Sequence, residues 1–241
     1  MPSIRPRPAV ALRLRRPLVT LGVLAAVLVL AAPALAVRVH VRVEGAAATI
    51  FGATEPLLTP ARGSWSPPEG PSLSVQAETP LGALERASRL GEFYYRVRAS
   101  DFGPYVDRIG RLAAAATTGW VYKVNGVSPP VGADKYVLRA GDRVLWYFAR
   151  FGPAGGPKTL AFHRTKCPGG VQAVAVDDNG RAKPATNVVF EIDGRRVRDR
   201  NGAICPRGHW HTLRATKPGT VRSRVVRNPR RAAQLQESDR A

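Results

Sequence analysis

The sequence has few of the residues, and none of the motifs, on which most enzymes depend. Two cysteines and four histidines occur among its 241 residues, and no histidine has a serine or cysteine beside it that would form a convincing nucleophile pair. The sequence contains no G-x-S-x-G, no H-E-x-x-H, no P-loop and no dinucleotide fingerprint. Asp101-Phe102-Gly103 has the letters of a kinase metal-binding motif, but the glycine-rich and catalytic loops that this motif requires are missing. We therefore expect a protein that is not an enzyme.

Both cysteines, Cys167 and Cys205, lie in the second half of the chain. In an exported protein such a pair most simply forms one disulfide, which stabilises the fold by roughly 3 to 4 kcal/mol in the chain-entropy description. The alternative is a zinc site formed by Cys205, His209 and His211. Their spacing matches no standard ligand pattern and a fourth ligand is not evident. We expect a disulfide, no metal site and no cofactor.

Residues 1–36 have the composition of an export signal. Five arginines precede an uncharged run from Pro17 to Ala36, which ends in Pro33-Ala34-Leu35-Ala36. A basic segment, an apolar segment and a small-residue site predict a secretory signal that is cleaved after Ala36. The alternative is a retained anchor, because about 20 apolar residues also span a bilayer. We expect an extracellular or cell-surface protein, which is membrane-anchored if the signal is not cleaved.

Acidic residues are scarce, since 17 Asp and Glu oppose 37 Lys and Arg and the formal net charge is +20. Removal of 1–36 takes away five arginines and no acid, which leaves 32 − 17 = +15. Such a surplus attracts polyanions, including anionic lipid headgroups, teichoic-type polymers, DNA and phosphorylated ligands. The arginines are not interleaved with aromatic residues on one element, which disfavours nucleic acid as a partner. An Arg-rich and Ala-rich composition also reflects codon usage in a GC-rich genome, so charge alone leaves the partner open.

A short segment rich in glycine and proline divides the chain. Residues 151–157 read Phe-Gly-Pro-Ala-Gly-Gly-Pro, as is typical of a linker. We expect a first domain over 37–150, a linker over 151–157 and a second domain over 158–228. The polar tail over 229–241 is expected to be disordered.

The first half combines strands with one helix. Residues 37–43 alternate apolar and polar, which places the valines on one face of a strand and Arg38, His40 and Arg42 on a solvated face. Thr79 and Pro80 form a helix start, with Thr79 as the N-cap and Pro80 at the first helical position. Gly91 is expected to end this helix.

Residues 93–148 carry a set of motifs that is too specific for a generic sheet. In chain order they are Phe93-Tyr94-Tyr95-Arg96-Val97, Ser100-Asp101-Phe102-Gly103-Pro104-Tyr105-Val106, Gly119-Trp120-Val121-Tyr122-Lys123-Val124-Asn125-Gly126, Gly132-Ala133-Asp134-Lys135-Tyr136 and Ala140-Gly141-Asp142-Arg143-Val144-Leu145-Trp146. This order resembles the C-terminal β domain of the vertebrate cobalamin carriers, transcobalamin and gastric intrinsic factor, and the related secreted bacterial domains of unassigned function. The resemblance covers residues 37–150.

The resemblance implies a β-grasp-like domain, in which a sheet wraps around one helix. In the carriers the similar turn and the similar tryptophan lie against the ligand. The resemblance therefore implies ligand contacts from Phe102, Gly103, Pro104, Tyr105 and Trp120, and cobalamin as a candidate ligand. The alternative for Trp120 is that it fills the core of the sheet. The carriers also enclose their ligand with a helical barrel that this chain lacks, so a separate helical-barrel protein is a candidate partner.

The second half has the pattern of a small antiparallel β-sandwich. Strands are expected over 159–163, 171–176 and 211–216, and a hairpin over 188–197 with Asp193-Gly194 at its bend. This half resembles the prealbumin-like and carboxypeptidase-regulatory modules, which serve as spacers or adhesion units. The predicted fold class of the chain is therefore α+β followed by all-β.

Two functions fit these features. The first is a secreted or surface-tethered binding protein whose β-grasp domain contacts a corrinoid-like or other amphipathic ligand. The second is a structural or adhesive cell-envelope module without a small-molecule ligand, held by its cationic surface to anionic polymers.

Overall fold

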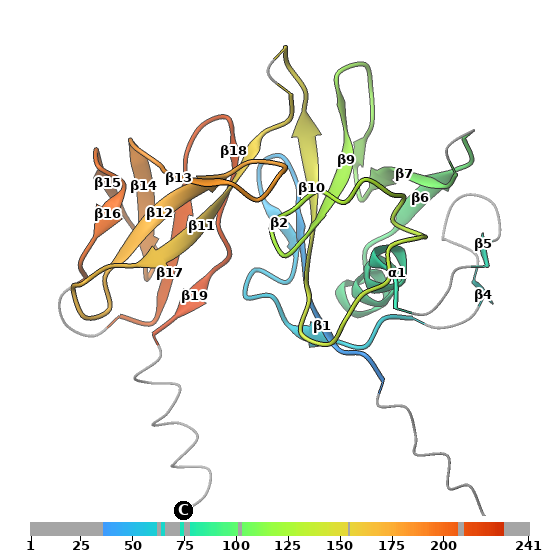
Figure 1. The fold of residues 1–241 in the computed structure, drawn as a ribbon, viewed down its shortest axis with the longest axis horizontal. Coiled ribbons are helices and arrows are strands. Elements are labelled where there is room, and N and C mark those ends of the chain that lie inside the picture. Colours follow the sequence, from blue (N-terminus) through green and yellow to red (C-terminus); the bar gives the residue numbers. More distant parts are fainter. Residues whose placement is uncertain are drawn as a thin grey trace, which may run out of the picture. The chain divides into compact units, whose positions relative to one another are not determined.

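The first half of the chain is built on a mixed five-stranded sheet in which the two central strands are parallel (Figure 1). The computed structural model describes residues 36–61, 64–65, 73–74, 78–100, 103–153, 155–206 and 210–228. The strand order is β2-β1-β10-β9, and β3 pairs with β1. The strands are β1 (Val39–Glu44), β2 (Thr49–Phe51), β3 (Leu57–Leu58), β9 (Thr118–Val124) and β10 (Arg143–Arg150). Strand β1 pairs with β10 in parallel, and the other pairings of this sheet are antiparallel.

Strand β1 is buried on both faces, which corrects the prediction of a solvated polar face. The alternating valines are fully buried as expected and face the helix. Arg38 is exposed and His40 is half-buried, whereas Arg42 is only 4% exposed. The polar side of β1 is buried because the second half of the chain packs against it.

The helix α1 (Pro80–Gly91) begins and ends where the sequence predicts. The Thr79 hydroxyl accepts a hydrogen bond from the Gly82 amide at 3.1 Å, which satisfies a backbone donor at the helix start. The left-handed residue at the other end is Glu92, with φ 50°. A side chain on Gly91 would meet the Phe51 ring, because its Cβ would lie only 2.6 Å away. Close packing therefore explains the glycine.

Leucines and alanines of α1 join the valines of β1 and residues of β10 in the core of the first half. The indole of Trp146 in β10 donates a hydrogen bond to the Pro80 carbonyl at 3.1 Å, which ties the helix start to the sheet. A three-stranded antiparallel sheet extends this core. Its strands are β6 (Tyr95–Arg98), β7 (Tyr105–Ile109) and β8 (Leu112–Ala113). A short pair, β4 (Ser64–Trp65) and β5 (Leu73–Ser74), lies between β3 and α1 in the sequence.

The second half contains two sheets that share one apolar core. The first sheet has the order β13-β12-β11-β18, with β16 paired to β12, and the second has the order β15-β14-β17-β19. The strands are β11 (Lys158–Arg164), β12 (Val171–Val176), β13 (Ala182–Pro184), β14 (Val188–Ile192), β15 (Arg195–Asp199), β16 (Ala203–Ile204), β17 (Thr212–Thr216), β18 (Thr220–Val221) and β19 (Val226–Arg227). Leu160 and Ala173 from one sheet pack with Phe190 and Leu213 from the other. This arrangement is sandwich-like.

The local predictions for the second half are confirmed. Asp193 and Gly194 have φ of 48° and 81°, the pair of positive values that a two-residue hairpin bend requires. Cys167 and Cys205 form a disulfide with a Cα–Cα distance of 6.0 Å, which fits an oxidising environment.

No helix among the described residues is long and apolar enough to cross a membrane. The tail predicted over 229–241, and the signal predicted over 1–36 except for Ala36, lie outside the described residues.

The two halves pack together through an apolar patch and a buried lysine. Leu145 and Tyr147, on the face of β10 away from the helix, form a small cluster with Val221 of β18. The fully buried Lys123 of β9 donates to the Asp177 carbonyl at 3.0 Å and pairs with the Asp178 carboxylate at 3.1 Å. Burial lowers the pKa of Lys123. Residues Ala36–Ala241 form one compact unit, and the division into two domains stays a prediction.

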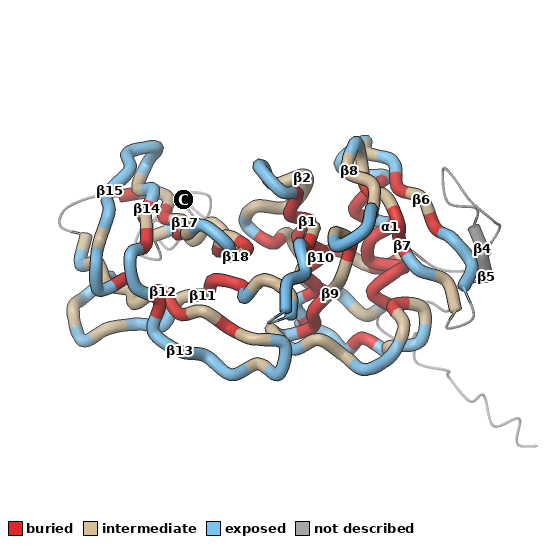
Figure 2. Tube along the Cα trace, turned by 90° about the horizontal axis from the view of Figure 1, so that it is seen from above, coloured by how far each residue is buried: buried red, intermediate tan, exposed pale blue. Residues whose placement is uncertain are grey.

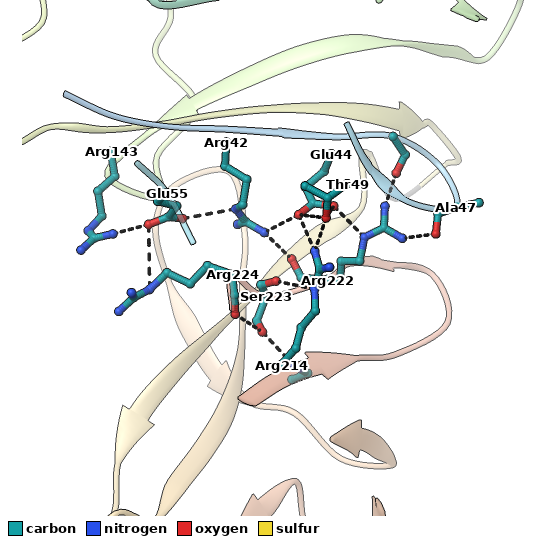
Figure 3. A network of polar contacts seen from close by, with 12 residues as sticks. Arg42, Glu44, Ala47, Thr49, Glu55, Arg143, Arg214, Arg222, Ser223 and Arg224 are labelled. Atoms are coloured by element: carbon teal, nitrogen blue, oxygen red, sulfur yellow. Dashed lines mark hydrogen bonds and ion pairs between the residues drawn. The ribbon is translucent and has the colours of Figure 1, made fainter. Parts of the chain in front are cut away.

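Two buried carboxylates, Glu44 of β1 and Glu55, pair with arginines of both halves (Figure 3). Glu44 is 1% exposed and accepts from Arg214 and Arg222, both at 2.6 Å, from Arg42 at 3.0 Å and from the Thr49 hydroxyl at 3.1 Å. Both carboxylate oxygens of Glu44 thus accept hydrogen bonds. Glu55 pairs with Arg42 at 3.2 Å, with Arg143, and with Arg224 at 3.9 Å. We call this set the carboxylate cluster: Arg42, Glu44, Thr49, Glu55, Arg143, Arg214, Arg222 and Arg224.

Replacement of Glu44 by Gln tests the contribution of this cluster. The amide would leave the guanidinium groups of Arg42, Arg214 and Arg222 buried beside a neutral group, and loss of one partner from a buried ion pair costs about 3 to 5 kcal/mol. We expect Glu44→Gln to lower the free energy of unfolding by that amount in urea titrations. The exposed Glu92→Gln serves as the control and should unfold at the wild-type midpoint. Equal midpoints for both variants would contradict a structural role of the cluster.

Candidate functional site

The predicted contact turn is a tight hairpin between β6 and β7. The Gly103 amide donates to the Ser100 carbonyl at 2.9 Å, and the Ser100 hydroxyl donates to the Gly103 carbonyl at 2.7 Å. Pro104 follows, and β7 begins at Tyr105, whose side chain is 46% exposed. Phe102 lies outside the described residues. The turn therefore presents Tyr105 as an exposed ring at the end of a strand.

Trp120 occupies a different position, in the core of the first half. Its side chain is 8% exposed, and its indole donates to the Leu112 carbonyl at 2.8 Å. Its ring packs edge-on against Phe148 at a centroid distance of 5.4 Å. Leu112 pairs with Ile109 at the far end of β7 from Tyr105, and the strand spans about 13 Å. The structure thus does not bring Trp120 next to the turn, and its role in ligand contact stays a prediction.

Of the residues considered for the alternative zinc site, Cys205 and His211 are described, and both have other partners. Cys205 is bonded to Cys167, so its sulfur is not available as a thiolate. His211 is exposed and contacts the Asp193 carboxylate at 3.4 Å, and His209 lies outside the described residues. Backbone hydrogen bonds from Thr212 and His211 lower the pKa of Asp193. The Asp193 carboxylate, at the hairpin bend, therefore binds the backbone at the start of β17 as an anion.

A cleft that the sequence did not predict lies where the two halves meet. Its volume is about 680 Å³. Strand β10 contributes Phe148 and Arg150, and strand β15 contributes Arg196 and Arg198. The rest of the lining comes from residues 45–46, Thr118, Pro157, Val189 and 216–222. We call this the basic cleft.

The lining of the basic cleft contains cations and no acid. Its charged residues are Arg150, Arg196, Arg198, Lys217 and Arg222. Arg150, Arg196 and Arg198 are exposed, and among the described residues none of them forms an ion pair. Glu191 lies opposite Arg196 in the hairpin register but is not paired with it. The cleft therefore has positive charge that no described side chain neutralises.

The cations of the cleft differ in how firmly they are held. Arg196 and Arg198 are two residues apart on β15 and therefore project to the same face, and Figure 2 shows this strand as exposed. Arg222 is fixed, because it donates to the Glu44 carboxylate at 2.6 Å and to the Gly45 carbonyl at 2.5 Å. The Lys217 ammonium donates to the Thr186 carbonyl at 2.8 Å. The cleft thus combines cations held by hydrogen bonds with exposed arginines that form no ion pair among the described residues.

Burial and charge act in opposite directions on the arginines of the carboxylate cluster. Burial lowers the pKa of Arg214, whereas the Glu44 carboxylate beside it raises that pKa. Burial likewise lowers the pKa of Arg224, and Glu55 opposes this shift. The two carboxylates therefore offset the free-energy cost of burying these guanidinium groups next to the cleft.

Comparison with known proteins gives one match for part of the chain. The sequence model of a family described as "Domain of unknown function (DUF4430)" matches residues 83–150. The matched segment runs from α1 through β10 and includes the turn, Trp120 and two residues of the cleft, Phe148 and Arg150. No curated protein matches the chain.

Replacement of Trp120 by Ala distinguishes a core role from a ligand contact. Removal of a buried tryptophan costs about 3 to 5 kcal/mol, so we expect Trp120→Ala to lower the free energy of unfolding by that amount. Tyr105→Ala, at an exposed position, should change it by less than about 0.5 kcal/mol. Both values come from urea unfolding followed by circular dichroism. A stable Trp120→Ala variant would argue against the core role.

Proposed function

We propose that this chain is an exported binding protein, not an enzyme, and that it holds an anionic cell-envelope polymer in the basic cleft. The observation that carries the proposal is the lining of that cleft, which has five cations and no acid. Cations that lie close together repel one another, and an anionic partner relieves that repulsion. A phosphodiester polymer of the teichoic type is the ligand class that we favour.

The chemistry of the lining supports this ligand class. Arginine forks bind phosphate oxygens with two parallel hydrogen bonds, and Arg196 and Arg198 project from one face of β15. Phe148 supplies an apolar surface for the carbon backbone of a polymer unit. A volume of about 680 Å³ falls in the usual range for small-ligand sites. The disulfide supports export, because such bonds persist in oxidising compartments.

Binding of polyglycerol phosphate by the full chain tests the proposal. We expect calorimetry to detect binding that weakens as salt increases, since released counterions accompany charge neutralisation. Arg196→Ser/Arg198→Ser should weaken it at least about 10-fold to 100-fold, the loss expected when even one charge-assisted hydrogen bond of about 1.5 to 3 kcal/mol is removed. Arg181→Ser/Lys183→Ser, two exposed cations outside the cleft, form the control and remove the same net charge.

Two outcomes would contradict this proposal. An equal loss of affinity in both double variants would mean that net charge, and not the cleft, binds the polymer. Tighter binding of a DNA oligomer with the same number of phosphates would replace the envelope polymer by nucleic acid, which the sequence disfavours.

The second candidate is an amphipathic, corrinoid-like ligand at the turn, with a separate helical-barrel protein as partner. We propose for this case that the first half is a β-grasp domain related to the cobalamin carriers and the second half a prealbumin-like spacer. The parallel pairing of β1 with β10 beside a single helix supports the first assignment. The exposed ring of Tyr105 supports a contact surface, and a Cβ on Gly103 would meet nothing within 4 Å.

Titration with cyanocobalamin tests the second candidate. An open face encloses a ligand incompletely, so we expect micromolar or weaker affinity. Tyr105→Ala should weaken that affinity by about 1 to 3 kcal/mol, the usual loss for an aromatic anchor. Phe151→Ala, at an aromatic ring of similar exposure (40%) outside the turn, should leave it unchanged. Absence of heat with several corrinoids would remove this candidate.

A further inference from the structure

A second cavity lies in the sandwich-like half, at the loop that joins β11 to β12. Its volume is about 480 Å³. Residues 162–171 form much of its lining, and Trp210 and residues of β19 complete it. The basic cleft shares none of these lining residues. The two cavities are therefore separate sites.

The lining of this cavity is apolar on one part and basic on another. The apolar part comprises Phe162, Val171, Trp210 and Val226. Phe162 stacks on Phe190 of the core at a centroid distance of 6.4 Å, and Trp210 is 7% exposed, so both rings are fixed by packing. The apolar part thus offers preformed aromatic surface to a ligand.

The lining contains five basic residues and no acid. They are His163, Arg164, Lys166, Arg224 and Arg227. Arg164, Lys166 and Arg227 are exposed, and within the described part of the chain none of the three forms an ion pair. Arg224, a member of the carboxylate cluster, has its Nε atom 3.9 Å from the Glu55 carboxylate. The Thr165 hydroxyl, which also belongs to the lining, is buried with no hydrogen-bond partner among the described residues.

The disulfide holds the loop that forms this cavity. Cys167 belongs to the lining and is bonded to Cys205, which directly follows β16. Strand β16 pairs with β12 through Val171 and Ile204. Backbone hydrogen bonds close the same loop, since the Thr165 amide donates to Gly170 at 3.1 Å and the Gly170 amide donates to Cys167 at 2.8 Å. The disulfide therefore fixes the basic residues of the loop relative to the sheet that carries the aromatic rings.

We propose that this cavity binds a small aromatic anion. The aromatic group packs against Phe162 and Trp210, and the carboxylate, sulfonate or phosphate group of the ligand faces Arg164 and Lys166. Charge complementarity selects an anion, because the lining has five basic residues and no acid. The rigid apolar surface selects an aromatic or similarly flat body. The oxidised loop is required, so reduction of the disulfide abolishes the site.

The probe for the test is 8-anilinonaphthalene-1-sulfonate, whose fluorescence rises in apolar surroundings, with N-phenyl-1-naphthylamine as the matched dye without the sulfonate. We expect the full chain to bind one equivalent of the sulfonate at micromolar affinity and the neutral dye at least about tenfold more weakly. Arg164→Ser/Lys166→Ser should weaken sulfonate binding about tenfold or more. Cys167→Ser/Cys205→Ser should lose most of it, with the far-ultraviolet circular dichroism unchanged.

Three control outcomes decide against the proposal. Arg181→Ser/Lys183→Ser removes the same charge from exposed positions outside the cavity, so an equal effect there would make the binding nonspecific. A loss of sulfonate binding in Arg196→Ser/Arg198→Ser, with no loss in Arg164→Ser/Lys166→Ser, would place the dye in the basic cleft. Equal affinity for the neutral dye would remove the anion requirement. Likewise, the absence of saturable sulfonate binding would remove the site. Failure of polymer binding at the cleft has no bearing on these outcomes.

Discussion

Two carboxylates buried beneath five arginines hold the two halves of this protein against each other. Glu44 is 1% exposed and Glu55 is 8% exposed, so each would be strongly unfavourable without partners. The partners come from both halves, since Arg42 and Arg143 belong to the first and Arg214, Arg222 and Arg224 to the second. Neither half alone satisfies these charges. The interface between the halves is therefore specified by charge as well as by the apolar patch on β10.

This interface accounts for the distribution of the remaining positive charge. Arginines that reach Glu44 and Glu55 are neutralised inside the protein, whereas those of β15 and the end of β10 face the basic cleft without a described acid. Arg222 belongs to both groups, because it binds Glu44 and lines the cleft. The carboxylate cluster thus positions part of the cleft directly. The scarcity of acidic residues matters here, because Glu44, Glu55 and Asp178 act within the interface and no acid lines either cavity.

Local features of the fold could be predicted from the sequence because their causes are local. The Thr79-Pro80 helix start, the Asp193-Gly194 bend and the disulfide each depend on the chemistry of one or two residues. The burial of Arg42 could not be predicted, because its neighbour Glu44 meets Arg214 and Arg222, which lie 170 and 178 residues away in the sequence. The basic cleft was missed for the same reason, since β10, β15 and residue 222 meet only in the folded chain. Trp120 shows a second limit, because its motif was compatible with a ligand contact and with a place in the core, and only the fold shows that its ring is buried.

The most direct test is the affinity of Glu44→Gln for polyglycerol phosphate, measured where circular dichroism shows that the variant is folded. The Glu44 side chain is not part of the cleft lining, but it fixes Arg222 and the approach of the two halves. Our account predicts that affinity falls about tenfold or more. Simple removal of a negative charge beside Arg222 would raise the affinity of an anion. Unchanged or tighter binding by Glu44→Gln would therefore contradict the claim that the carboxylate cluster builds the site.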